Sequence, residues 1–121
     1  MSDALKGGEF LIRDTPAADI FIPEEWDEES LMIASSTREF LEKEIFPNLD
    51  RIDQQEDGLM VSLLNKAADL GLLGISVPEE YGGLGKDFKT SMLTTEITGA
   101  GHSFAVAISA HTGIGTLPIL Y

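Results

Sequence analysis

The segment at residues 103–111, Ser-Phe-Ala-Val-Ala-Ile-Ser-Ala-His, constrains the fold most, because as a helix it is apolar on nearly every side. A helix of this kind is buried over most of its surface. Four short helices in a chain of 121 residues can hardly supply that much cover. We therefore expect this segment to face either a further domain or a ligand.

Helical periodicity and capping residues predict an all-α, bundle-like domain of four to five helices. Asp27 can cap the first helix, and Pro47 ends it because proline lacks the amide that a helix interior needs. The other predicted helices follow in chain order: about 59–70 with Gly71 as the left-handed stop, Asp87 to about Thr98, 103–111, and a fifth that begins at a capping Thr116 with Pro118 in its first turn. Because this fifth helix has barely begun at Tyr121, we expect the chain to be the leading part of a longer protein.

Apolar residues at helical spacing define the faces that we expect to point inward. On the first three helices they are Leu31, Ile33, Ala34, Phe40, Leu41 and Ile45; Met60, Leu63, Leu64, Ala67 and Leu70; and Met92, Leu93 and Ile97. Residues 48–58 are expected to form a polar connection, and 72–77 an extended segment against the core. Residues 1–26 are expected to be an irregular, extended leader that docks a few apolar side chains, with 27–121 as the domain proper.

The charge of the chain excludes several partners. The formal net charge is −13, and residues 1–58 carry 16 acidic against 5 basic side chains. Such a field repels a phosphate backbone, so nucleic acid is not an expected partner. Cysteine is absent, which excludes disulfides and thiolate chemistry. We find no signal peptide and no window with the roughly 18 apolar residues of a membrane span, and we expect a cytoplasmic location.

The stretch at 78–85, Pro-Glu-Glu-Tyr-Gly-Gly-Leu-Gly, holds three glycines in four positions. Backbone amides there could bind an anion ahead of the next helix, but the spacing matches neither a P-loop nor a dinucleotide-binding turn, and two carboxylates precede it. Glu79 and Glu80 are adjacent, so in an extended chain they point apart rather than form an acid–base pair. We interpret the stretch as a structural turn with a solvated carboxylate pair.

Two histidines and a row of small residues are the remaining candidates. His102 and His111 have no acidic residue between them to complete a metal face, so no metal is expected. We interpret His102 as a capping or packing residue and His111 as a hydrogen-bonded core histidine, with a site role for His111 as the alternative. The small residues leave space beside apolar walls for a neighbouring helix, the favoured interpretation, or for an apolar ligand: Ala105, Ala107, Ser109, Ala110, Gly113 and Gly115.

Three blocks of sequence, in matching order and spacing, resemble the N-terminal helical domain of the acyl-CoA dehydrogenase family. They read LGLLGISVPEEYGGLG at 70–85, TTEITGAG at 94–101 and AHTGIGTLPIL at 110–120. The resemblance extends from about Ile33 to Tyr121. The leader, with KGGEFLIRDT at 6–15, and the AHTGIG block are most similar to the very-long-chain branch of that family.

The resemblance implies that the chain is one domain of an FAD-dependent enzyme whose other domains are a middle β-barrel and a C-terminal helical bundle. In the family, a glutamate removes the α-proton of a fatty acyl-CoA thioester while the β-hydride passes to the flavin, the reaction of fatty acid β-oxidation. An electron-transferring flavoprotein then takes the electrons. The flavin-contacting segment and the catalytic glutamate would follow Tyr121. We therefore assign no catalytic or cofactor-binding residue here, and we expect the chain to be inactive alone and homo-oligomeric as part of its parent.

The resemblance also assigns one wall of the acyl pocket to Ser109, Ala110, His111 and Ile114, with a contribution from residues 75–85. Because Ala110 and Gly113 are small, we expect a deep pocket that accepts long acyl chains. Two alternatives remain open: a stand-alone helical interaction module without flavin chemistry, and a part of an acyl-CoA oxidase.

Overall fold

The structure, a computed structural model, describes residues 8–20, 22 and 25–121. No strand occurs in this part of the chain, which confirms the all-α fold class. The α-helices are α1 (Glu28–Phe40), α2 (Leu49–Asp53), α3 (Leu59–Asp69), α4 (Phe88–Thr98), α5 (Ser103–Ser109) and α6 (Leu117–Leu120).

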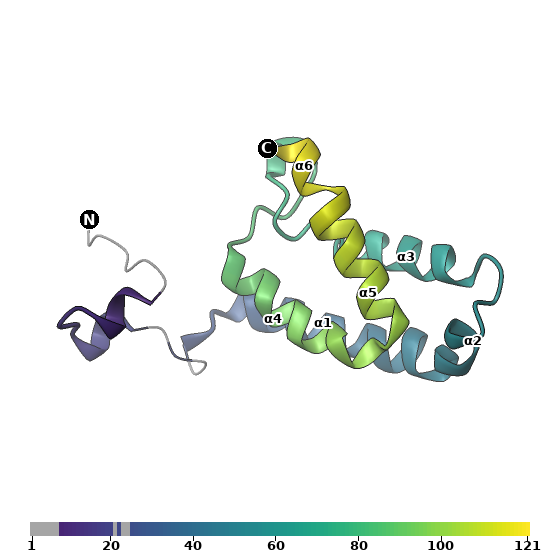
Figure 1. The fold of residues 1–121 in the computed structure, drawn as a ribbon, viewed down its shortest axis with the longest axis horizontal. Helices are drawn as coiled ribbons and strands as arrows, with labels where there is room; N and C mark the ends of the chain where they lie inside the picture. The colour runs from purple at the N-terminus through teal and green to yellow at the C-terminus, as the bar shows by residue number, and fades with distance from the viewer. Residues whose placement is uncertain (1–7, 21, 23–24) are drawn as a thin grey trace.

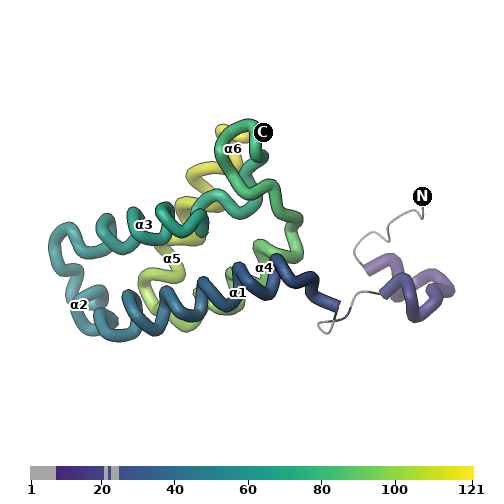
Figure 2. The backbone as a smooth tube through the Cα atoms, turned by 180° about the vertical axis from the view of Figure 1, so that it is seen from behind, coloured from purple at the N-terminus to yellow at the C-terminus, as the bar shows by residue number. Residues whose placement is uncertain are grey.

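The helices enclose one core. α1 and α4 lie side by side, and α5 contacts both α4 and α3 (Figures 1 and 2). α6 lies beside the loop that precedes α4 in both views. At the centre, Phe104 is fully buried, and its ring centroid lies 5.8 Å from that of Phe40 with the two rings tilted by 52°. Tilted aromatic pairs of this kind add stability beyond the apolar area that they bury.

The described part of the leader forms turns of its own. Two 3₁₀ turns, Glu9–Leu11 and Ala17–Asp19, close through local backbone hydrogen bonds. Phe10, Leu11 and Ile12 are 51, 74 and 90% exposed, so the docking expected of leader side chains is not observed for these three. Residues 1–7, 21, 23 and 24 of the predicted leader lie outside the described residues.

The start of α1 agrees with its predicted cap, and its end does not agree with the predicted stop. The Asp27 carboxylate accepts a hydrogen bond of 2.6 Å from the Ser30 amide. Beyond α1, a π segment (η4, Leu41–Ile45), a 3₁₀ turn (η5, Phe46–Asn48) and α2 continue the helical path. Pro47 does not stop it, because proline stands early in the 3₁₀ turn, where no helical hydrogen bond requires its amide. The predicted polar connection at 48–58 therefore begins as helix.

Burial confirms most of the predicted inward faces. The buried members are Ala34, Phe40, Leu41, Ile45, Leu63, Ala67 and Leu93, and the partly buried members that pack on the core are Ile33, Met60, Leu64 and Ile97. Leu31, Leu70 and Met92 do not belong to these faces, being 49, 52 and 51% exposed, and their predicted burial is wrong.

Hydroxyl side chains explain two of these errors, because they occupy the interior between α1 and α4. Ser30 and Thr90 are each 3% exposed, and their hydroxyl oxygens lie 3.1 Å apart. Thr94 is also buried, and its hydroxyl donates to the carbonyl of Thr90 in its own helix. These short, satisfied side chains let the two helices approach closely, while the neighbouring Leu31 and Met92 point outward.

The connection at 71–86 is built from turns and is not the extended segment predicted for 72–77. Gly71 adopts a φ of 78°, which confirms the left-handed stop after α3. The amides of Leu84, Gly85 and Lys86 donate to carbonyls at Gly74, Val77 and Ile75 over 2.9, 2.9 and 2.8 Å. These bonds close the connection on itself, and its Leu72 and Ile75 side chains enter the core.

The glycine-rich stretch within this connection is a turn. The 3₁₀ turn Glu79–Tyr81 ends at Gly82, whose φ is 82°. Gly83 lies so close to residue 77 that a Cβ atom on it would stand 2.0 Å from the Val77 carbonyl oxygen. Position 83 therefore has no room for any side chain.

α5, a π segment (η8, Ala110–Gly115) and α6 form one continuous helical run. Phe104 and Ile108 are buried, whereas Val106 and Ile114 are 71 and 83% exposed. The described chain thus covers one face of the run, which agrees with the expectation that these few helices cannot cover a segment that is apolar nearly all round. The physical reason is the one anticipated from the sequence: these short helices have too little surface to cover the rest.

The run also bears on the expectation that the chain has no membrane span. Ser103–Leu120 is 18 residues long, with a mean hydropathy of 1.4 and 11% of it buried, and so has the length and composition of a span. This run was not expected from the sequence because the joined fourth and fifth helices were predicted as separate, and the absence of a membrane span stays a prediction. Length and composition alone are weak evidence of a span, since the core helix of a larger protein passes the same test.

Candidate functional site

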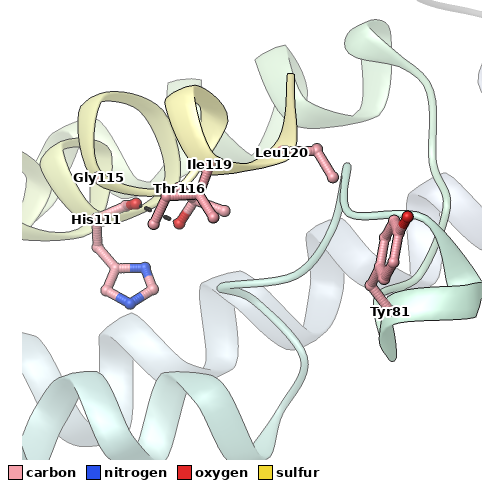
Figure 3. A pocket seen from close by; sticks show the side chains of 6 residues that line it. All are labelled: Tyr81, His111, Gly115, Thr116, Ile119 and Leu120. Carbon is pink, nitrogen blue, oxygen red and sulfur yellow. Dashed lines mark hydrogen bonds between the residues drawn. The ribbon is translucent and has the colours of Figure 1, made fainter.

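Two hollows flank the run. The first, about 580 Å³, lies between the run and the loop that carries Tyr81 (Figure 3), and its lining is Tyr81, His111, Gly115, Thr116, Ile119 and Leu120. The second, about 410 Å³, is a groove toward α4 and the 71–86 connection, and its serine and threonine lining is Ser76, Ser91, Thr94, Thr95, Ser109 and Thr112. Both volumes fall in the range of small-molecule sites.

The structure separates the four residues predicted to form an acyl wall. His111 lines the first pocket and Ser109 the groove. Ala110 and Ile114 are exposed and belong to the lining of neither. They instead continue, at intervals of four residues, a surface that begins at Val106. We call Val106, Ala110 and Ile114 the apolar face. The assignment of Ser109, Ala110, His111 and Ile114 together to the acyl wall stays a prediction.

His111 and Thr116 differ from their predicted roles. His111 is exposed, so its interpretation as a core histidine is wrong; Phe104 and Ile108 supply the contacts of the run with the core. Thr116 has helical backbone angles and makes no capping bond. Its hydroxyl donates backwards to the His111 carbonyl over 2.6 Å (Figure 3).

His102 ties the start of α5 to α2 and makes no capping hydrogen bond. Its φ is 52°, and its Nδ1 lies 3.5 Å from Oδ2 of Asp53. The Ser103 hydroxyl donates to the other oxygen of Asp53 over 3.2 Å. Within the described residues, no group of three or more His, Asp and Glu side chains is placed to hold a metal ion.

Charged groups border the groove at the start of α4. Asp87 caps α4 by accepting bonds of 3.0 Å from both the amide and the hydroxyl of Thr90. The Thr90 amide bond lowers the pKa of Asp87 below its ordinary value of 3.8. Lys86, which lines the groove, pairs with Glu29 at 2.6 Å, and this hydrogen bond raises the pKa of Lys86.

The Asp87 cap predicts a change in acid stability. Since its folded pKa is depressed, its ionised form contributes stability above about pH 3.8 that is lost as the pH falls through the folded pKa. Asp87→Asn keeps a capping oxygen without the charge, so we expect unchanged stability near neutral pH and a shallower acid limb; Asp87→Ala should lose about 1 kcal/mol near neutral pH. Urea unfolding against pH measures both, and an acid limb of Asp87→Asn as steep as wild type would contradict the assignment.

Comparison with known proteins identifies the domain. Residues 27–121 match the family described as acyl-CoA dehydrogenase, N-terminal domain. The chain belongs to the acyl-CoA dehydrogenase family. A probable acyl-CoA dehydrogenase of Bacillus subtilis is 44% identical over 120 residues, which cover 99% of this chain and 20% of that protein. The crystal structure of an acyl-CoA dehydrogenase complexed with FAD from Bacillus anthracis superposes with a TM-score of 0.88 and 44% identity, over 96% of this chain and 20% of that one.

The acyl-CoA dehydrogenase relatives are much longer than this domain. The chain spans about a fifth of the length of the two proteins just named. A short-chain specific acyl-CoA dehydrogenase from Bos taurus is also 33% identical, over 90 residues. Family membership therefore does not decide an acyl chain length, and the similarity to the very-long-chain branch stays a prediction.

Sequence reasoning missed several residues of the first pocket. The sequence assigns Ile119 and Leu120 only to the start of a helix, and Thr116 to its cap. Tyr81 lies in the 75–85 segment that was expected to contribute to the wall, but it was not singled out. The available signal in the sequence was an aromatic residue between two carboxylates and two glycines, and the structure leaves its side chain 68% exposed.

The described residues do not fit FAD by themselves. Six of the seven Lys and Arg side chains in the described part of the chain pair with carboxylates: Arg13, Lys43, Arg51, Lys66, Lys86 and Lys89. The chain carries 21 acidic residues in all, and such a field disfavours the diphosphate of a flavin dinucleotide. We therefore derive no flavin step from this chain.

Proposed function

We propose that this chain supplies one wall of the acyl pocket of an FAD-dependent acyl-CoA dehydrogenase that oxidises fatty acyl-CoA thioesters. The apolar face carries the proposal. Val106 is 71% and Ile114 83% exposed, with the small Ala110 between them, and nothing in the described chain covers them. Exposed apolar surfaces of this kind mark sites of interaction.

A fatty acyl chain suits this face chemically. It has no polar group along its length, so it gains free energy from contact with Val106 and Ile114, whereas a polar ligand would find no hydrogen-bond partner there. In the parent enzyme the wall would exclude water from the reacting carbons and hold the chain in one orientation. The small Ala110 leaves depth for a long chain.

The wider context is part of the same proposal. We assign FAD to the longer protein because a relative of similar fold is complexed with FAD. The family resemblance supports fatty acid β-oxidation, an electron-transferring flavoprotein as acceptor and a homo-oligomeric parent. We also propose a cytoplasmic location. Oxygen consumption during turnover would separate this dehydrogenase from an acyl-CoA oxidase.

The test is a chain-length series on the dehydrogenase that carries this domain, from butanoyl-CoA to eicosanoyl-CoA. With an artificial electron acceptor, we expect Ala110→Phe to lower kcat/KM about a hundredfold for the longest substrates and to leave butanoyl-CoA nearly unchanged, because the added ring fills the far end of the pocket. Ala100→Phe, at an exposed position in the turn before α5, is the matched control.

Two results would overturn this proposal. Identical chain-length profiles for wild type and Ala110→Phe would remove the residue from the acyl wall. Absence of acyl-CoA-dependent reduction of the acceptor by the wild-type enzyme would favour the interaction-module alternative.

A further inference from the structure

The run between α5 and α6 contains a π segment that a second hydrogen bond reinforces. In a π segment each backbone bond spans one residue more than in an α-helix, and such segments are rare and frequently occur at functional sites. Here the segment covers Ala110–Gly115. The Thr116 hydroxyl donates to the carbonyl of His111, five residues back, over 2.6 Å, so a side chain repeats the spacing of the π bonds.

The π segment decides which residues share the first pocket. In a regular α-helix, residues five apart are about 140° apart around the axis. His111 and Thr116 are five apart, yet both line the same hollow (Figure 3). Ile119 and Leu120, which follow on α6, line it as well.

Gly115 shows how closely the π segment is packed. A Cβ atom at this position would stand 3.3 Å from the carbonyl oxygen of Ala110, also five residues back. The backbone of residue 115 thus lies close to the Ala110 carbonyl, which is the carbonyl that pairs with residue 115 in π hydrogen bonding. Gly113, by contrast, has no neighbouring atom within 4 Å of the place that a Cβ atom would take, so it is not what holds the segment.

We propose that Thr116 is a positioning residue that holds the π segment and thereby sets where Ile114 of the apolar face and the side chains of α6 lie against the acyl-CoA substrate; this rests on the proposed function. Without the hydroxyl, the segment relaxes to an α-helix. A π turn contains one residue more than an α turn. When the segment becomes α-helical, the helix beyond it therefore rotates by about 100° and shifts by about 1.5 Å along the axis. Ile119 and Leu120 then leave the pocket that His111 lines.

The first test is structural and independent of activity. A crystal structure of this chain with Thr116→Val, which removes the hydroxyl at nearly constant volume, should show an α-helical 110–116 and a rotated α6. Thr116→Ser should keep the π segment. Thr112→Val is the matched control, because the Thr112 hydroxyl makes an ordinary bond to the Ile108 carbonyl, four residues back, over 2.8 Å. A retained π segment in Thr116→Val overturns the proposal.

The second test measures specificity in the dehydrogenase that carries the domain. Thr116→Val should change KM about tenfold for the substrates whose chains reach α6 and leave kcat within about twofold, while Thr116→Ser keeps the wild-type profile. An unchanged profile despite a lost π segment would refute the specificity role. Lack of any turnover by wild type would count against the proposed function instead, and the crystal structures would still decide the role of Thr116.

Discussion

Replacing Phe104 by alanine should lower the free energy of unfolding of this domain by about 4 kcal/mol. The side chain is 0% exposed and is the largest that the described part of the domain buries fully. Its removal opens a cavity among the end of α1, α3 and α5, and it ends the ring contact with Phe40. Because a domain of this size has a total stability on the order of 10 kcal/mol, the change is a large fraction of the whole.

Val106→Ala is the matched control for Phe104→Ala. It lies in the same helix, two residues away, with 71% of its surface exposed, so its truncation should change stability by less than about 0.5 kcal/mol. Urea unfolding followed by circular dichroism measures both variants. Equal losses for Phe104→Ala and Val106→Ala would mean that the core does not centre on Phe104.

Gly83→Ala should be the most damaging small substitution in the connection before α4, with a loss of about 3 kcal/mol or more. Its Cβ would stand 2.0 Å from the Val77 carbonyl oxygen, and this atom belongs to the backbone, which cannot rotate away. The two arms of the connection must then separate, breaking the bond from the Gly85 amide to that same carbonyl. Hydrogen exchange should show lost protection at Gly85 and Lys86.

Gly82→Ala separates the cost of the clash from the cost of the backbone angle. Gly82 has a φ of 82° but no atom within 4 Å of its added Cβ, so alanine should cost only about 1 kcal/mol there and leave the exchange protection of Lys86 intact. If Gly83→Ala were as mild as Gly82→Ala, the close approach of residues 77 and 83 would be wrong.

The helix ends could be predicted from the sequence because they depend on local chemistry. Asp27 and Asp87 cap α1 and α4 as expected, and Gly71 provides the left-handed stop after α3. Each of these contacts lies within a few residues of chain. Pro47 was the exception, since the same residue also fits the first turn of a new helical segment, and the fold uses it in that way.

The helix faces were predictable only in part. Apolar spacing identified Leu63, Ala67 and Leu93 correctly, but it placed Leu31 and Met92 inside. Periodicity assumes that a buried face is apolar, and the interface of α1 and α4 is filled instead by hydroxyls that satisfy one another or their own backbone. Which of two adjacent stripes turns inward depends on the partner helix, which a single-helix pattern does not contain.

The family resemblance identified the candidate site, and the structure shows that its residues lie on different sides of the helical run. The motif singles out the segment containing Ala110 and His111, and the structure places these neighbours on different sides of the run, with only His111 in the pocket of Tyr81. The cause is ordinary helix geometry, because successive side chains of a helix point about 100° apart around its axis. No residue preference marks a π segment clearly, so the Thr116 hydroxyl could not be assigned to it in advance.

The sequence by itself determined the helical class, the aspartate caps of α1 and α4, the glycine turn and the family, because these follow from local chemistry and from motifs whose order is preserved. Only the tertiary structure decided how much of the 103–111 segment is covered. The segment is apolar nearly all round, yet the described helices bury only Phe104 and Ile108 on it and leave Val106 exposed, as they do Ile114 just beyond it. Burial is a property of the area that neighbouring elements can supply, and this domain supplies enough for one face of the helix.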